Sequence, residues 1–152
     1  MKTFKLFSIL MSSFLSLPIL ADESITPVEM TVYRSPSCSC CGKWSEHVEA
    51  NQFNIKTIIT DDMQAIKAKY GIPDKLASCH TALVNGYVIE GHVPANDIKK
   101  LLQLKPDVAG ISAPRMPLGS PGMETEGQKQ AYQVISFDKQ GKMTVFAEHE
   151  GN

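Results

Sequence analysis

VEMTVYRSPSCSCCGKW, residues 28–44, joins a strand pattern to a cluster of three cysteines. Its first six residues alternate in polarity and are rich in strand formers, which predicts a first strand. A Ser-Pro-Ser break follows, and the spacing of Cys41, Trp44 and Val48 then predicts a short helix over residues 42–50. The cysteines therefore fall where a strand gives way to a helix.

A second strand and a second helix are predicted next. Residues 55–59 are rich in β-branched side chains, which is typical of a strand. Asp61 and Gln64 resemble a capping pair at the start of a helix, and Gly71 is expected to end it. The apolar face of this helix is expected to be formed by Met63, Ile66 and Tyr70.

Asn85-Gly86 lies between two apolar runs, which is a strong short-range signal for a β-hairpin. Counting outward from a two-residue turn places Cys79 opposite His92. Directly opposed residues share a face of the sheet. Cys79 and His92 are therefore expected to lie side by side, with His80 pointing away if the strand remains extended.

The remaining chain contains one further helix, a long loop and a closing hairpin. The helix is predicted to begin near Pro94 and to stop before Pro106. Residues 105–130 lack periodicity and are dense in proline and glycine, so they are predicted to form a loop. Residues 132–137 and 143–146 predict the hairpin.

The predicted order of elements is strand, helix, strand, helix, hairpin, helix. This order predicts an α/β fold with a thioredoxin-like βαβαββα core, followed by a long Pro/Gly/Met loop and a C-terminal β-hairpin. The first strand leads into a C-x-x-C pair, Cys38 and Cys41, at the position where thioredoxins carry theirs.

The first 21 residues have the features of a secretory signal peptide. Two lysines precede a short apolar run that stops at Ala21 and is followed by acidic residues. A proline and several serines make this run poorly suited to cross a membrane. We therefore expect residues 1–21 to be removed, leaving residues 22–152 as a single thioredoxin-like metal-binding domain in the periplasm.

The charge of the chain argues against large anionic partners. Removal of the leader leaves 13 basic residues against 16 acidic ones. Nucleic acids and anionic lipids select basic surfaces, so neither nucleic acid nor membrane is expected as a partner. A mildly acidic protein suits the capture of cations.

Four cysteines in an exported chain normally indicate two disulfides, but their spacing here resists that interpretation. Cys40 and Cys41 are adjacent, and a bridge from Cys38 to Cys40 would be cramped. One ordinary Cys38–Cys41 disulfide with Cys79 as a core thiol is an alternative, although it leaves Cys40 without a role. A helix N-terminus lowers nearby thiol pKa values, and thiolates either bind metal or attack disulfides.

A thioredoxin-like fold would bring the segment before the hairpin against the cysteine cluster. Thiolates and imidazole are ligands for Cu(I) or zinc. Structural zinc sites usually supply two well-spaced pairs, whereas C-x-C-C crowds three thiolates together and suits bridging between ions. The spacing therefore favours copper, as Cu(I), with more than one ion per chain. The expected ligands are Cys38, Cys40, Cys41, Cys79 and His92.

Two methionines of the long loop extend this set of soft donors. Met116 and Met123 have no core face to fill, and a thioether is a soft copper ligand, although loop packing is the alternative for both. The methionines that fit periodic core positions are Met30, Met63 and Met143.

Four other side chains are assigned simpler roles. Trp44 is expected in the core. His47, on a solvated helix face, and His149, in a tail, are expected to take no part in the metal site. His80 is either a support for a ligand or a loop histidine.

Four motifs in order resemble a single family. They are CSCCGKW at 38–44, SCHTA at 78–82, GYVIEGHVP at 86–94 and GSPGME at 119–124. Together they resemble the periplasmic CopG-type metal-binding family found with copper-resistance operons. The resemblance implies a thioredoxin-like domain with redox chemistry and a copper centre on the cysteines and histidine named above. Arg115 departs from the glycine expected before Met116, so a ligand role is less secure for Met116 than for Met123.

Three functions remain open at this point. The first is periplasmic copper handling, which includes cycling between Cu(I) and Cu(II) as a copper oxidoreductase and contacts with other copper-resistance proteins. The second is thiol–disulfide exchange in which Cys38 attacks and Cys41 resolves; the extra thiol Cys40 and Cys79-His80, in place of a cis-proline, argue against it. The third is a structural zinc module, which the adjacent thiols disfavour.

Overall fold

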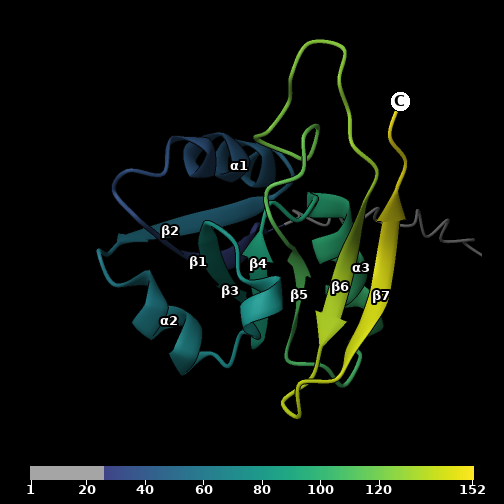
Figure 1. The fold of residues 1–152 in the computed structure, drawn as a ribbon. Coiled ribbons are helices and arrows are strands. Elements are labelled where there is room, and N and C mark those ends of the chain that lie inside the picture. The colour runs from purple at the N-terminus through teal and green to yellow at the C-terminus, as the bar shows by residue number, and fades with distance from the viewer. Residues whose placement is uncertain (1–25) are drawn as a thin grey trace, which may run out of the picture.

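The computed structural model describes residues 26–152, which form one seven-stranded mixed sheet flanked by helices. The elements (Figure 1) are β1 (Val28–Arg34), α1 (Ser39–Glu49), β2 (Phe53–Ile59), α2 (Met63–Lys69), the 3-10 helix η1 (Asp74–Leu76), β3 (His80–Val84), β4 (Tyr87–Gly91), α3 (Ala95–Leu104), β5 (Gly110–Ala113), β6 (Tyr132–Phe137) and β7 (Met143–His149). The leader expected at residues 1–21 lies outside the described residues. Within residues 26–152, none of the helices has the length and apolar character of a membrane span.

The strands follow the order β2-β1-β3-β4-β5-β6-β7. The pairs β1–β2 and β4–β5 are parallel, and the other neighbours are antiparallel. The hairpin predicted from Asn85-Gly86 is confirmed, and its register runs from the turn to Thr81 opposite Glu90. Asn85 and Gly86 both have positive φ angles, 47° and 84°, as a tight two-residue hairpin turn requires.

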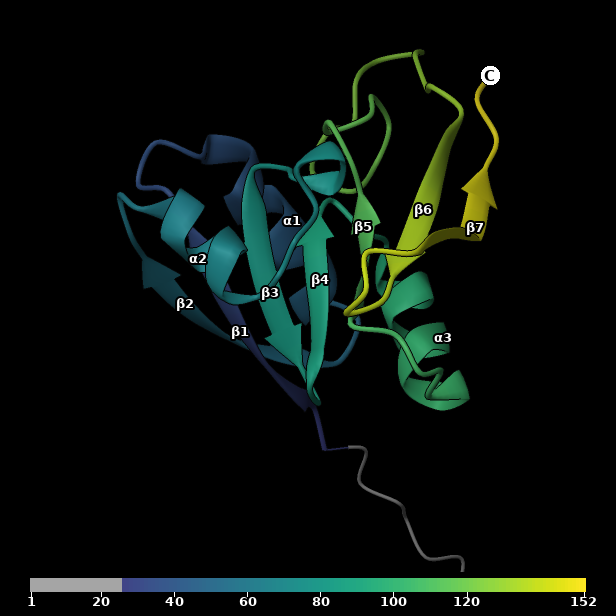
Figure 2. The ribbon, with the colours of Figure 1, turned by 60° about the horizontal axis from the view of Figure 1, so that its bottom comes forward.

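Helices cover both faces of the sheet (Figure 2). α1 and α3 pack on one face over the main core, in which Trp44 is fully buried, as predicted. α2 and η1 lie on the other face, over a smaller apolar cluster. The residues of this second cluster are Ile72, Leu76, Val88 and Phe137. Successive residues of β3 and β4 therefore point alternately to the α1 side and to the α2 side.

Three elements differ from the sequence prediction. Helix α1 begins at Ser39 rather than near residue 42, so the adjacent cysteines lie in its first turn. The N-cap of α2 is Asp62, which accepts a hydrogen bond from the Ala65 N–H at 2.9 Å; the assignment of Asp61 was wrong. β5 lies inside the predicted loop, where its four residues are all buried between β4 and β6. Such a short strand has no polar alternation to reveal it.

The burial of α2 and of one methionine also differs from expectation. Met30 is buried, but Met143 is 40% exposed on the edge strand β7, so its assignment to the core was wrong. The predicted apolar face of α2 is only half-buried, and the buried residue of this helix is Lys67. A buried ammonium group needs a charged partner, which the site below supplies.

His149 is the last residue of β7 and makes structural contacts, rather than lying in a tail. Its Nε2 lies 2.7 Å from Asp97 Oδ2, and its ring stacks on Tyr132 with 4.6 Å between ring centroids. These contacts fix the end of β7 to α3.

His47 also has a structural role, because it joins α1 to α3. Its Nε2 accepts a hydrogen bond from the N–H of Ala95 at 3.2 Å. Ala95 is the first residue of α3, and this helix has no capping side chain at its own N-cap. Burial lowers the pKa of His47 below its ordinary value of 6.5, against the opposing effect of Glu124.

The stability of the metal-free protein should therefore fall on acidification. The unfolded chain protonates His47 near pH 6.5 and the folded chain only at lower pH. The contribution of neutral His47 to the free energy of unfolding is therefore complete above pH 6.5, and it is lost as the pH falls through the lower pKa of the folded state. His47→Gln should make the urea midpoint less dependent on pH between about 7 and about 5, though His80 and His92 titrate in the same direction. An unchanged pH dependence in this variant would contradict the assignment.

Candidate metal centre

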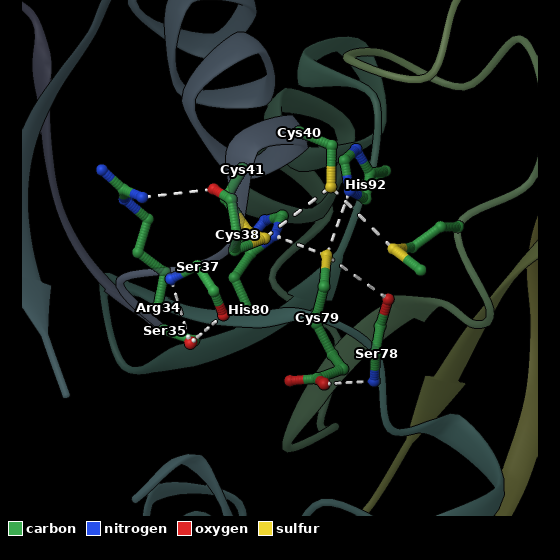
Figure 3. Close-up of a disulfide and its surroundings, with 12 residues drawn as sticks. Arg34, Ser35, Ser37, Cys38, Cys40, Cys41, Ser78, Cys79, His80 and His92 are labelled. Carbon is green, nitrogen blue, oxygen red and sulfur yellow. Dashed lines mark hydrogen bonds between the residues drawn. A yellow bond between two sulfur atoms is a disulfide. The ribbon is translucent and has the colours of Figure 1, made fainter. Parts of the chain in front are cut away.

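Four cysteine sulfurs and two imidazole rings meet at the end of the sheet where β1 leads to α1 (Figure 3). The four Sγ atoms all lie within 4.8 Å of one another. The ligand atoms of Cys79, His80 and His92 satisfy the same limit, so Cys79 belongs to both groups. We refer to these residues as the cysteine–histidine cluster, which consists of Cys38, Cys40, Cys41, Cys79, His80 and His92.

The N-terminus of α1 carries three of the cysteines. Cys38 is the N-cap residue, and its side chain makes no capping hydrogen bond. Arg34 Nη1 donates to the carbonyl oxygen of Cys38 at 3.2 Å, which holds the turn between β1 and α1. The positive end of a helix stabilises thiolates, so this location favours either metal binding or thiol chemistry.

Cys38 and Cys41 form a disulfide in the structure, which is the pairing that the sequence left open as an alternative. Cys40 and Cys79 are free thiols, and Cys40 Sγ lies 3.7 Å from Cys38 Sγ. A sulfur in a disulfide is not a thiolate ligand. Metal binding by all four sulfurs therefore requires reduction of this disulfide by two electrons.

His92 is oriented by a backbone carbonyl, and its predicted position beside Cys79 is confirmed. Its Nδ1–H donates to the Pro121 carbonyl oxygen at 2.7 Å, which leaves Nε2 with a lone pair. That Nε2 lies 3.1 Å from Cys79 Sγ. A ring held in this way, with its other nitrogen facing a ligand position, is typical of metal-binding histidines.

Cys79 is protonated in the metal-free protein. Burial, together with the nearby Cys40, raises the pKa of Cys79 to about 12. Its S–H therefore donates to His92 Nε2. A metal ion that binds Cys79 must displace this proton, so its affinity decreases as the pH falls.

His80 also faces the cluster, and the prediction that it points away was wrong. His80 is the first residue of β3, pairs with Arg34 and lies on the same side of the sheet as Ala82, whereas Cys79 precedes the strand. His80 Nδ1 lies 3.3 Å from Cys79 Sγ, and its ring packs on Trp44 with 4.2 Å between centroids. Its buried Nε2 has no hydrogen-bond partner among residues 26–152. Burial holds the pKa of His80 well below its usual value, so the ring is neutral, as metal binding requires.

A buried ion pair on the α2 side of the sheet anchors the segment that carries Cys79. Glu90 Oε1 accepts from the Ser78 N–H at 2.6 Å and from Lys67 Nζ at 2.5 Å. Glu90 Oε2 accepts from the Thr81 hydroxyl at 2.7 Å. Burial raises the pKa of the Glu90 carboxyl, and Lys67 opposes this shift. Glu90 was not among the residues predicted from the sequence, although a glutamate in an otherwise apolar strand is a signal of a buried polar role.

The long loop after β5 covers the cluster from outside. Met116 Sδ lies 4.0 Å from Cys40 Sγ, whereas Met123 lines a hollow of about 260 Å³ that also includes Cys40. The contact with a cluster sulfur thus belongs to Met116, the methionine whose ligand role the resemblance made less secure. Gly122 has a φ of 83°, and a Cβ there would lie 2.8 Å from the Trp44 backbone nitrogen. Only glycine lets the loop approach α1 this closely.

The donor set fits a soft metal ion. Thiolate sulfur and neutral imidazole nitrogen select Cu(I) or zinc over harder cations. The adjacent Cys40 and Cys41 are poorly placed to complete one tetrahedron, but reduced sulfurs at these distances can bridge neighbouring ions.

Comparisons with known proteins bear on this site. A family described as a protein of unknown function, DUF411, matches residues 76–123, which include Cys79 and His92. A solved structure of the copper resistance protein CopG, form 2, is 42% identical with a TM-score of 0.78, covering 82% of this chain and 99% of that one. Form 1 is also 42% identical, with a TM-score of 0.77 and coverages of 81% and 98%. The search of curated proteins gave no match.

Proposed function

The chain belongs to the family of the copper resistance protein CopG, and on that basis we propose that it is an exported protein that binds Cu(I) in a cysteine-bridged site holding more than one ion. The observation that carries this proposal is the meeting of four cysteine sulfurs within 4.8 Å of one another. Copper is the cargo of this site, and its binding serves copper resistance.

The proposed ligands are assigned by position in the cluster. Cys79 is the proposed bridge, because its sulfur belongs to both groups of ligand atoms. His92 contributes Nε2, the nitrogen left free by the hydrogen bond to Pro121. Met123 is proposed as a further thioether donor in the loaded site, and Met116 as a thioether that contacts copper only transiently. The remaining ligands are Cys38, Cys40 and Cys41 once their disulfide is reduced.

We also propose a thioredoxin-like core within a single domain, residues 22–152, in the periplasm. The strand order β2-β1-β3-β4, with α1 and α3 on one face and α2 on the other, supports the thioredoxin-like assignment. The leader-like residues 1–21 and the copper-resistance relatives support export. The expected partners are copper ions and other periplasmic copper-resistance proteins.

Redox chemistry forms the second part of the proposal. Opening the Cys38–Cys41 disulfide takes two electrons and two protons from an external dithiol and gives two thiols. These thiols lose their protons when Cu(I) binds. Cycling of the bound copper between Cu(I) and Cu(II) passes one electron per ion to or from an external partner.

The same disulfide favours a second candidate function, thiol–disulfide exchange. Cys38 is half-buried at the helix N-terminus and would attack, and the buried Cys41 would resolve. The free thiol of Cys40, and Cys79 paired with His92, have no role in that reaction.

The experiment that separates these functions is copper loading of the reduced protein. The chain from Asp22 is reduced without oxygen, loaded with Cu(I), and assayed for copper per chain and for free thiols. We expect more than one copper per chain with all four thiols protected. No retained copper, with rapid reduction of insulin through Cys38 and Cys41, would instead establish the oxidoreductase.

A further inference from the structure

The sulfur atoms of the site become more exposed from the inside outward. Cys41 is fully buried and Cys40 is half-buried, while Met116 beyond them is 37% exposed. Met116 Sδ lies 4.0 Å from Cys40 Sγ, and Cys40 Sγ lies 3.7 Å from Cys38 Sγ. A chain of sulfur atoms therefore leads from the surface to the buried cysteine–histidine cluster.

The backbone at Met116 is strained. Arg115 and Met116 have φ angles of 70° and 57°, so two consecutive residues other than glycine are left-handed. Residues in this conformation are energetically unfavourable and concentrate at functional positions. The segment is fixed on both sides, by the buried Ala113 of β5 and by Ser120, whose hydroxyl donates to the Pro117 carbonyl oxygen at 2.6 Å. Met116 is thus held in place beside Cys40.

Met123 lies in a different part of the same loop. Its N–H donates to the Ser120 carbonyl oxygen at 2.8 Å, and its own carbonyl oxygen accepts from the Gly119 N–H at 2.8 Å. These bonds close a compact turn in which Met123 is half-buried. Among the described residues, the thioether that contacts a sulfur of the cluster is therefore that of Met116.

We propose that Met116 is the uptake residue of the site: its thioether binds Cu(I) arriving from solution and passes the ion to Cys40. This inference rests on the copper function proposed above and adds the route of loading. The step is a ligand exchange without change of oxidation state. The bond between copper and Cys40 Sγ forms, the Cys40 thiol proton leaves to solvent, and the bond between copper and Met116 Sδ breaks.

A thioether suits this first contact. It is neutral and soft, so it binds Cu(I) without losing a proton. A cysteine must lose its thiol proton when it binds the ion, whereas a thioether has no proton to lose. Transfer from a neutral thioether to a thiolate is favourable, so Met116 speeds loading without being needed in the loaded state.

The test is the rate at which Cu(I) transfers from its bicinchoninate complex to the reduced protein, followed by stopped flow. Met116→Leu should slow transfer by at least about tenfold, the lower end of the effects seen for groups around metal sites. The final copper per chain and the affinity should be unchanged. Met143→Leu is the matched control, because Met143 is 40% exposed on β7, and it should load at the wild-type rate.

A second readout requires no copper. With methionine methyl groups labelled by ¹³C, the Met116 resonance should move at the first additions of Ag(I), before the other methionines respond. An unchanged transfer rate in Met116→Leu, or a loss of final copper that makes Met116 a permanent ligand, would overturn the inference alone. A wild-type protein that takes up no Cu(I) would instead overturn the proposed copper function.

Discussion

Replacement of Cys79 by serine should remove most of the copper-binding capacity of the protein. Among residues 26–152, its sulfur is the one shared by the two groups of ligand atoms, and it lies 3.1 Å from His92 Nε2. Loss of groups that merely support metal ligands costs about 10–100-fold in affinity, so loss of this thiolate should exceed about 100-fold. The serine hydroxyl is a hard, weakly acidic donor and does not replace a thiolate toward Cu(I).

The measurement is competition for Cu(I) against a chelator of known affinity, with copper per chain at saturation. Ser78→Ala is the matched control, because the Ser78 hydroxyl lies 4.0 Å from Cys79 Sγ but offers no soft donor. This control should bind copper as the wild type does. Equal stoichiometry and affinity in Cys79→Ser and the wild type would show that the site is built without Cys79.

Replacement of Glu90 by alanine should cause a large decrease in the free energy of unfolding. Glu90 is fully buried, and it accepts hydrogen bonds from Lys67, Thr81 and Ser78. Its removal leaves the Lys67 ammonium buried without its countercharge, which costs about 3–5 kcal/mol in the free energy of unfolding. The segment leading to Cys79 also loses its anchor.

Urea unfolding of the metal-free protein measures this effect. Glu90→Gln keeps one acceptor for the Ser78 N–H and should lose less stability than Glu90→Ala. Glu29→Ala is the surface control, because Glu29 is exposed and its side chain accepts one hydrogen bond from the described residues, from Asn54 at 2.7 Å; its effect should stay within about 0.5 kcal/mol. A Glu90→Ala variant as stable as this control would contradict the role given to the ion pair.

The hairpin shows what the sequence could predict. Asn85-Gly86 determines a register, and the register determines which side chains meet, so Cys79 and His92 were placed correctly. The prediction was wrong for His80, which is the first residue of β3, pairs with Arg34 and packs on Trp44. Cys79 precedes β3 and His92 follows Gly91, whose positive φ ends β4, and local sequence carries only a weak signal of such a bend.

Features that depend on contacts between distant segments could not be predicted. β5 is recognisable only from its neighbours: at Gly110 a Cβ would collide with the Val88 carbonyl oxygen, so the tight pairing with β4 demands glycine. The partnership of His47 with Ala95 joins two helices, and that of Lys67 with Glu90 joins a helix to the sheet. Hydrophobic periodicity records which residues are apolar, but not which polar residues are buried together.

The central claim is a copper centre bridged by cysteine sulfur, and X-ray absorption at the copper edge tests it most directly. The sample is the reduced chain from Asp22 loaded anaerobically with Cu(I), with Cys79→Ser measured beside it. The account predicts a first shell dominated by sulfur together with scattering from neighbouring copper ions, and loss of the copper–copper signal in the variant. A first shell of nitrogen and oxygen alone, or isolated copper without a copper neighbour, would contradict it.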